Sequence, residues 1–135
     1  MSYLIVIIGL PASGKSYLLN KFARHFTNPT IFDDYSKHHS TTIELKAAIK
    51  RGDDILISDP LFCISQNLDT LLDLFPETYS CDIRNFENNP EQCLINAKIR
   101  NQNGANKEVE GLIKLLSKNY NPTHELEPVF NGVIE

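Results

Sequence analysis

A glycine-rich segment at residues 9–16, with the sequence GLPASGKS, constrains this chain more than any other feature. It matches the pattern G-x-x-x-x-G-K-[ST] at every defined position, and it stands between a run of aliphatic residues and a helical pattern. Glycines let the backbone curl so that successive N–H groups point inward, where the positive end of the following helix also lies. The segment is therefore predicted to bind the phosphates of a nucleotide.

Each residue type in this motif has an expected role. Lys15 is expected to reach the β- and γ-phosphates, and Ser16 is expected to hold Mg²⁺ through its hydroxyl, so ATP and Mg²⁺ are the expected cofactors. A chance match in a chain of this length has a probability of roughly half a percent at average residue usage. The predicted nucleotide-binding residues are Gly9, Pro11, Ala12, Ser13, Gly14, Lys15, Ser16 and Tyr17.

The length of the chain limits its organisation. It has 135 residues, which predicts one domain spanning residues 1–135. The apolar run at residues 4–8 is far too short for a membrane span, so no membrane association is expected. The N-terminus lacks the basic region of a secretory signal, which predicts a cytoplasmic protein, or one of the host-cell cytoplasm if the chain is viral.

Charge and cysteine content narrow the function classes. The formal net charge is −4, from 13 basic and 17 acidic residues, which argues against a protein that coats nucleic acid without sequence preference. The 3 cysteines include no C-x-x-C pair, as is typical of a reducing compartment without a structural zinc site. Neither feature predicts an oligomeric state.

Short β-rich runs alternate with helical patterns along the whole chain. This alternation predicts an α/β fold with a central parallel sheet of four or five strands and crossover helices. The Asn89-Pro90 pair predicts a capped helix start, and Thr41 to Glu44 reads as a capping box. Strands are predicted at 3–8, 30–32, 54–58 and 78–84, and residues 129–134 either add a final strand or pack across an edge of the sheet. Helices are predicted at 14–26, 41–52, 65–75, 90–101 and 108–119.

Several nucleotide-binding classes are excluded by their missing motifs. A GTPase needs a D-x-x-G switch, and no aspartate lies three residues before any of the 6 glycines. It also needs an N-K-x-D motif, whereas the nearest candidate, Asn106-Lys107, is followed by Glu108 and Val109. Larger ATPase motors require further motifs for which this chain has no room. The size suits a nucleotide, metabolite or polynucleotide kinase.

Three segments together resemble the small P-loop kinases of the polynucleotide 5′-hydroxyl kinase type, a group that includes bacteriophage end-repair kinases. They are residues 9–16, residues 31–35 (IFDDY) at the second strand, and residues 57–59 (ISD) at the third. The resemblance implies a three-layer P-loop NTPase fold, nucleoside or polynucleotide kinase-like, with a short helical lid at residues 90–106. It also implies transfer of the γ-phosphate of ATP to a hydroxyl, most often on DNA, RNA or a nucleoside, at a 5′-hydroxyl or a hydroxylated base.

The resemblance implies roles for the matching side chains. Phosphoryl transfer needs a carboxylate to accept the hydroxyl proton and cations around the phosphate oxygens. Asp33 is the candidate general base, and Arg100 is the candidate lid arginine beside Lys15. Asp59 is expected either to support the metal or to contact substrate. The remaining candidates for substrate binding are Asp34 and Lys37.

Two positions depart from the pattern of these kinases. Asn96 stands where the resemblance suggests another lid arginine, and Ser36 replaces a basic residue near the substrate. Lys37 is a candidate substitute for the missing basic residue near the substrate. The candidates to replace the missing lid arginine are Arg84, Lys98 and Lys107. These departures keep two alternatives open, a small-metabolite kinase and an ATP-binding regulatory protein without transfer activity.

Overall fold

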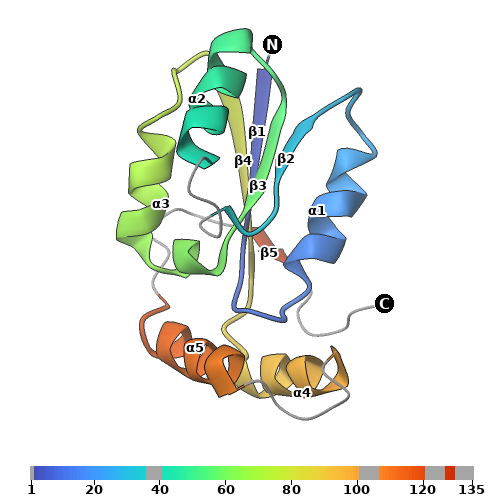
Figure 1. Cartoon of the computed structure of the whole chain (residues 1–135), viewed down its shortest axis with the longest axis vertical. Helices are drawn as coiled ribbons and strands as arrows, with labels where there is room; N and C mark the ends of the chain where they lie inside the picture. Colours follow the sequence, from blue (N-terminus) through green and yellow to red (C-terminus); the bar gives the residue numbers. More distant parts are fainter. Residues whose placement is uncertain (1, 36–40, 101–106, 121–126, 130–135) are drawn as a thin grey trace.

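The computed structural model has three layers, in which helices cover both faces of a parallel sheet (Figure 1). It describes residues 2–35, 41–100, 107–120 and 127–129. The strand order is β2-β3-β1-β4-β5. The strands are β1 (Ser2–Ile8), β2 (Thr30–Phe32), β3 (Ile55–Ser58), β4 (Tyr79–Phe86) and β5 (Glu127–Val129). The helices are α1 (Lys15–Ala23), α2 (Thr41–Arg51), the short 3₁₀ helix η2 (Pro60–Cys63), α3 (Ser65–Leu72), α4 (Pro90–Arg100) and α5 (Lys107–Lys118).

Strand β1 is central because its side chains are apolar on both faces. Residues 4–8 are all buried, and the strand pairs in parallel with β3 on one side and β4 on the other. Alternate side chains enter two different cores. One core contains Ile5 and Ile7 with Leu19 of α1. The larger core contains Leu4 and Val6 with side chains of α2 and α3.

The predicted elements are confirmed, with differences at their ends. Helix α1 ends at Ala23 rather than at residue 26, and α3 ends at Leu72 rather than at residue 75. Strand β4 extends to Phe86 because residues 79–85 pair with β1 and Phe86 pairs with Val129 of β5, although most of its side chains are only half-buried. Of the candidate final strand at 129–134, residues 130–134 lie outside the described residues; β5 pairs with β4 and ends at Val129.

The helix starts show one correct prediction and one error. Asn89 caps α4 as predicted, because its Oδ1 accepts a hydrogen bond of 3.1 Å from the backbone N–H of Gln92. The capping-box prediction for Thr41 is wrong, since Thr41 is the first residue of α2 itself and is buried. A threonine inside the first turn has its backbone in the helix, so its side chain cannot act as the preceding cap.

Helices α4 and α5 lie together at the carboxyl end of the sheet, below the other elements in Figure 1. Ile113 and Leu116 anchor α5 in the larger core. The predicted lid, residues 90–106, corresponds to α4, while residues 101–106 lie outside the described ranges. Within the described part of the chain, no helix is both long and apolar enough to cross a membrane.

Candidate active site at the phosphate loop

The glycine-rich segment forms the connection between β1 and α1, at the carboxyl edge of the sheet, where open α/β sheets bind ligands. Gly14 precedes α1 with φ of 100°, and Ala12 is also in the left-handed region with φ of 63°. A Cβ atom on Gly9 would lie 2.4 Å from Ser13 Oγ, so a larger residue at this position would force Ser13 to move. The loop is therefore tightly curled, as a phosphate cradle requires.

Lys15 is the buried cation of this loop. Its Nζ donates a hydrogen bond of 2.8 Å to the carbonyl oxygen of Leu10, and its side chain is almost wholly buried. Burial lowers the pKa of Lys15, while the negative charges of Asp34 and Asp59 act in the opposite direction. A buried ammonium gains from a further anion, which a nucleotide phosphate would supply.

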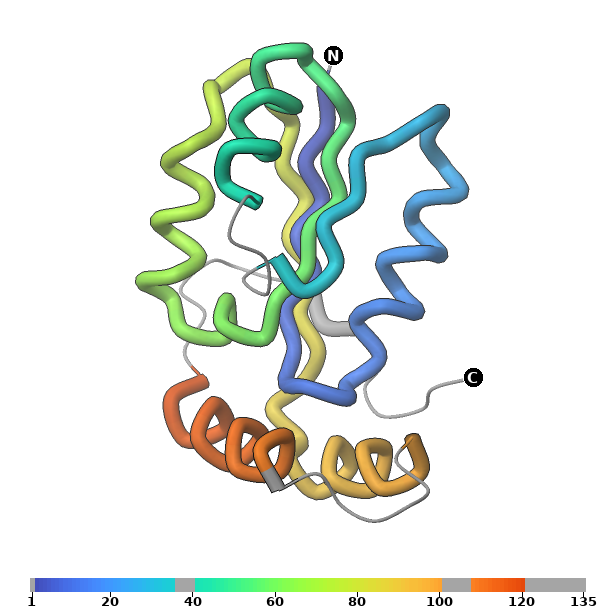
Figure 2. The backbone as a smooth tube through the Cα atoms, viewed as in Figure 1, coloured from blue at the N-terminus to red at the C-terminus, as the bar shows by residue number. Residues whose placement is uncertain are grey.

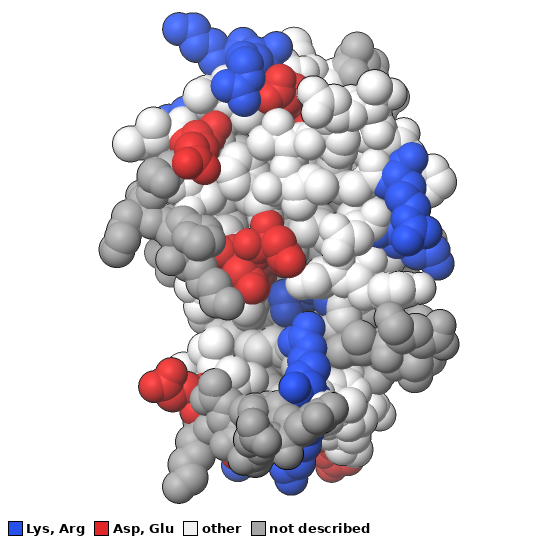
Figure 3. All heavy atoms as spheres, turned by 45° about the vertical axis from the view of Figure 1, so that its right-hand side comes forward, with Lys and Arg blue, Asp and Glu red and all other residues white. Residues whose placement is uncertain are grey.

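A cavity of about 210 Å³ brings the predicted phosphate-binding groups together. Its lining comes from the phosphate loop, from the residues that follow β2 and β3, and from helices α4 and α5. Figure 3 shows acidic and basic side chains next to each other near the middle of one face. The lining residues are Pro11, Ala12, Gly14, Lys15, Ser16, Asp34, Pro60, Arg100, Val109 and Leu112.

The predicted nucleotide-binding residues do not all line this cavity. Gly9 and the buried Ser13 belong to the loop but are absent from the lining. The hydroxyl of Ser13 has no hydrogen-bond partner within the described residues. Tyr17 is exposed on α1 and does not line the cavity either.

The two adjacent aspartates after β2 lie at different cavities. Asp34 has φ of 55°, and it lines the phosphate cavity. Asp33 lines a separate groove, and its Oδ1 accepts a hydrogen bond of 2.8 Å from Ser58 Oγ at the end of β3. Ser58 was not among the predicted site residues. The sequence signals for it were its place at the end of a buried strand and its place beside Asp59 in a segment that resembles the small P-loop kinases.

Asp59 is buried and acts as a cap. Its Oδ1 accepts a hydrogen bond of 2.8 Å from the backbone N–H of Leu61, at the start of η2. The described residues contain no group of three or more His, Cys, Asp or Glu side chains that could hold a metal by themselves. In a nucleotide site, Mg²⁺ keeps several waters and takes few protein ligands in addition to the phosphates. Ser16 and Asp59 are the protein groups that suit it.

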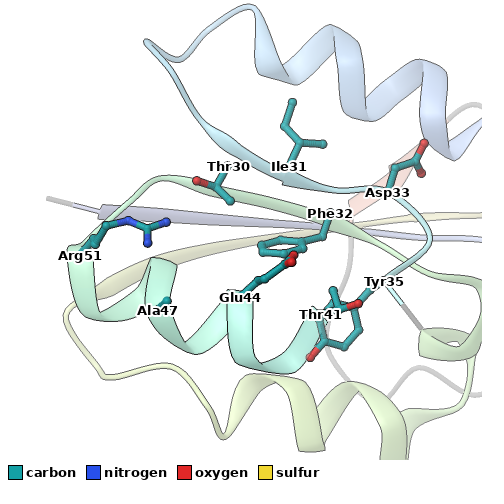
Figure 4. A pocket seen from close by; sticks show the side chains of 9 residues that line it. All are labelled: Thr30, Ile31, Phe32, Asp33, Tyr35, Thr41, Glu44, Ala47 and Arg51. Atoms are coloured by element: carbon teal, nitrogen blue, oxygen red, sulfur yellow. The ribbon is translucent and has the colours of Figure 1, made fainter. Parts of the chain in front are cut away.

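A second, larger groove of about 480 Å³ runs between β2 and α2 (Figure 4). Asp33 lies at one end of the labelled side chains and Arg51 at the other. Arg51 forms an ion pair with Asp53, with 2.8 Å between Nη2 and Oδ2. The lining residues are Thr30, Ile31, Phe32, Asp33, Tyr35, Thr41, Glu44, Ala47 and Arg51.

The lid contributes one predicted residue and one that was not predicted. Arg100 lines the phosphate cavity, as expected of a lid arginine. Asn96 is buried, and its Nδ2 donates a hydrogen bond of 3.0 Å to the carbonyl oxygen of Ala12. Neither Lys98 nor Arg84 lines the cavity; the guanidinium of Arg84 lies over the ring of Phe22 instead.

The two remaining candidate cations are not placed by the structure. Lys37 lies outside the described residues, and the side chain of Lys107, the first residue of α5, is not described either. Arg100 and Lys15 are therefore the basic residues that the described part of the chain brings to the phosphate cavity.

Three solved structures share this fold at 14–16% identity. A chain of the Pnkp1/Rnl/Hen1 RNA repair complex matches with a TM-score of 0.60 over 89% of this protein, which spans only 46% of that chain. A gluconokinase from Sinorhizobium meliloti 1021 matches with a TM-score of 0.63, over 93% of this protein and 79% of the gluconokinase. Kti12 from Chaetomium thermophilum, solved with ADP-AlF3, matches with a TM-score of 0.57, over 94% of this protein and 87% of the Kti12 chain. The fold is therefore that of the P-loop kinases.

Sequence comparison identifies a relative as well. No family model matches the chain. An uncharacterized protein of Acanthamoeba polyphaga mimivirus, R277, is 30% identical over an aligned length of 105 residues, and the match covers 74% of each chain. With this identity, and with a P-loop kinase fold, the protein belongs to the same family as mimivirus R277.

Proposed function

We propose that this protein is an ATP-dependent kinase that transfers the γ-phosphate of ATP to a hydroxyl group, on a nucleic acid or a nucleoside. The observation that carries the proposal is the phosphate cavity, in which Lys15, Ser16 and Arg100 meet. These side chains supply two cations and a hydroxyl, which suit a triphosphate with its metal ion. Asp33 lies beside the cavity, one residue from Asp34 in its lining.

The reaction follows from the roles of these side chains. Asp33 accepts the proton of the acceptor hydroxyl, while the oxygen of that hydroxyl forms a bond to the γ-phosphorus. The bond from that phosphorus to the β-phosphate oxygen breaks, and ADP leaves. Lys15 and Arg100 offset the charge on the transferring group. Ser16, with Asp59 nearby, would hold Mg²⁺, and this ion would supply positive charge that neutralises the phosphate oxygens. Asp33 afterwards releases its proton to solvent.

The groove between β2 and α2 is our candidate for the acceptor site. It begins at the proposed base, and its volume lies within the range of small-molecule sites. Hydroxyl groups from Thr30 and Tyr35 and the ring of Phe32 would suit the sugar and base of a nucleoside.

A small-metabolite kinase is the second candidate, and the charge of the groove favours it. Asp33 and Glu44 bring negative charge to the lining, and Arg51 already pairs with Asp53. Carboxylates repel the phosphates of a nucleic-acid strand, whereas they accept hydrogen bonds from the hydroxyls of a neutral molecule. A nucleoside and a small polyol both satisfy this condition.

The test is transfer of label from γ-labelled ATP to a panel of acceptors. The panel contains 5′-hydroxyl oligonucleotides, nucleosides and sugar acids such as gluconate. We expect one class to be labelled by the wild type, and Asp33→Asn to lose nearly all transfer while it still binds ATP. If ATP binds but no acceptor is ever labelled, the protein is a nucleotide-binding regulator, and the kinase proposal is wrong.

A further inference from the structure

Asn96, on the lid helix α4, contacts the phosphate loop directly. Its side chain is only 5% exposed, and its Nδ2 donates a hydrogen bond of 3.0 Å to the carbonyl oxygen of Ala12, 84 residues earlier. Figure 2 shows the turn between β1 and α1 immediately above α4. The lid helix is thus joined to the loop by a buried polar contact.

The amide of Asn96 is held in one orientation by its own helix. Gln92, one turn earlier, donates from Nε2 to Asn96 Oδ1 at 3.0 Å. The backbone N–H of Gln92 in turn bonds to the capping side chain of Asn89. With its oxygen occupied in this way, the amide of Asn96 presents its NH₂ group to the loop.

The bond to Ala12 acts on a strained part of the loop. Ala12 has φ of 63°, a conformation that a non-glycine residue adopts only when its surroundings impose it. Lys15 holds a second loop carbonyl, that of Leu10. Side chains therefore hold two carbonyl oxygens of the loop, at alternate positions.

Asn96 is also placed to govern the lid arginine. Arg100 follows it by four residues, so the two side chains lie on the same face of α4, one turn apart. Arg100 lines the phosphate cavity, and Asn96 binds the loop that forms its wall. A helix tethered at Asn96 therefore holds Arg100 at the cavity.

We propose that Asn96 is a positioning residue, which docks the lid helix on the phosphate loop and presets both Ala12 and Arg100 for the phosphates of ATP. This inference rests on the proposed nucleotide binding but not on any acceptor. It also gives a role to the departure from the kinase pattern at residue 96, because an amide that binds the phosphate loop stands there in place of a second lid arginine. Preorganised groups bind charge without a reorganisation step.

The test uses ATP binding, measured by calorimetry, in the wild type and in three variants of α4. Asn96→Ala removes the tether, and we expect about tenfold weaker ATP binding, which corresponds to about 1.4 kcal/mol. Gln92→Ala leaves Asn96 in place but frees its amide, and we expect a smaller loss, about threefold. Ile95→Ala, at an exposed position of the same helix, is the matched control and should bind ATP like the wild type.

A double-mutant cycle separates positioning from mere packing. If Asn96 acts through Arg100, Asn96→Ala should weaken ATP binding much less in an Arg100→Ala background than in the wild type. Hydrogen exchange without nucleotide gives an independent readout: Asn96→Ala should speed exchange in α4 and in residues 10–15, and Ile95→Ala should not.

Three results would overturn the inference. One is a lower melting temperature for Asn96→Ala with unchanged ATP affinity, which would make the residue structural only. Another is full additivity of the effects of Asn96→Ala and Arg100→Ala on the free energy of ATP binding. The third applies if Asn96→Ala does not fold: unchanged ATP affinity in Gln92→Ala would then overturn the inference. A wild type that fails to bind ATP at all would instead refute the proposed function, and this inference with it.

Discussion

Ser58 Oγ donates a hydrogen bond of 2.8 Å to Asp33 Oδ1 and so joins the end of β3 to the proposed base at the end of β2. Ser58 is wholly buried, whereas Asp33 is exposed. An exposed carboxylate has several rotamers, and a bond from a fixed neighbour selects one of them. The relationship predicts that Ser58 acts in catalysis through the orientation of Asp33.

Ser58→Ala should lower kcat about tenfold and leave the KM for ATP unchanged, because only the orientation of the base is lost. Steady-state kinetics with the acceptor found by labelling measures both constants. Ser80→Ala, at an exposed position on β4, is the control. An equal loss in the control, or a change confined to the KM for ATP, would contradict the role given to Ser58.

Lys15→Met should abolish ATP binding and yet raise the melting temperature of the nucleotide-free protein. Burial lowers the pKa of Lys15, so the folded state holds its ammonium at a free-energy cost that an apolar side chain of similar length avoids. We expect a gain of about 1 kcal/mol in the free energy of unfolding at pH 7. Thermal unfolding and calorimetric titration with ATP measure the two effects.

The same lowered pKa determines a pH dependence. Between the folded-state pKa of Lys15 and its ordinary pKa of 10.5, the unfolded chain binds more protons than the folded protein. Stability therefore rises with pH across this window through this group. The advantage of Lys15→Met over the wild type should shrink as the pH is raised toward 10.5. An advantage that grows with pH would show that burial is not the dominant effect.

Gly9→Ala should destabilise the protein by about 1–3 kcal/mol, because the new Cβ would lie 2.4 Å from Ser13 Oγ and 3.1 Å from Phe86 Cδ2. Displacement of Ser13 should also weaken ATP binding. Gly111→Ala is the matched control: nothing lies within 4 Å of the added atom, and the site is inside α5. This control should gain about 0.5–1 kcal/mol from helix propensity. Denaturant unfolding of both variants measures the contrast, and equal effects would contradict it.

Ala47→Trp should fill the groove between β2 and α2 and raise the KM for the acceptor by about tenfold or more, with the KM for ATP unchanged. Ala47 is exposed, so the larger ring need not disturb the core. Lys46→Trp places the same ring on the adjacent exposed position, outside the lining of the groove. If both variants behave like the wild type, the acceptor binds elsewhere.

Much of the fold was predictable because it depends on local patterns. The aliphatic run of β1 predicted a strand, and the glycine-rich segment predicted the curled loop before α1, since hydrophobic periodicity and glycine spacing act over a few residues. Asn89 was predicted as a cap on the same grounds. Thr41 shows the limit of such patterns, because a capping residue and a first-turn residue are adjacent and alike in type.

The candidate site was predictable in its residue types but not in its contacts. Local sequence placed Asp33, Asp34 and Ser58 at strand ends, but only the pairing of β2 with β3 brings Ser58 to Asp33. Only the structure shows the left-handed backbone of Asp34, at the point where the two aspartates turn toward different cavities. Asn96 was read as a missing arginine. Its bond to Ala12 joins segments 84 residues apart, and such contacts follow from how the layers pack, which no local pattern encodes.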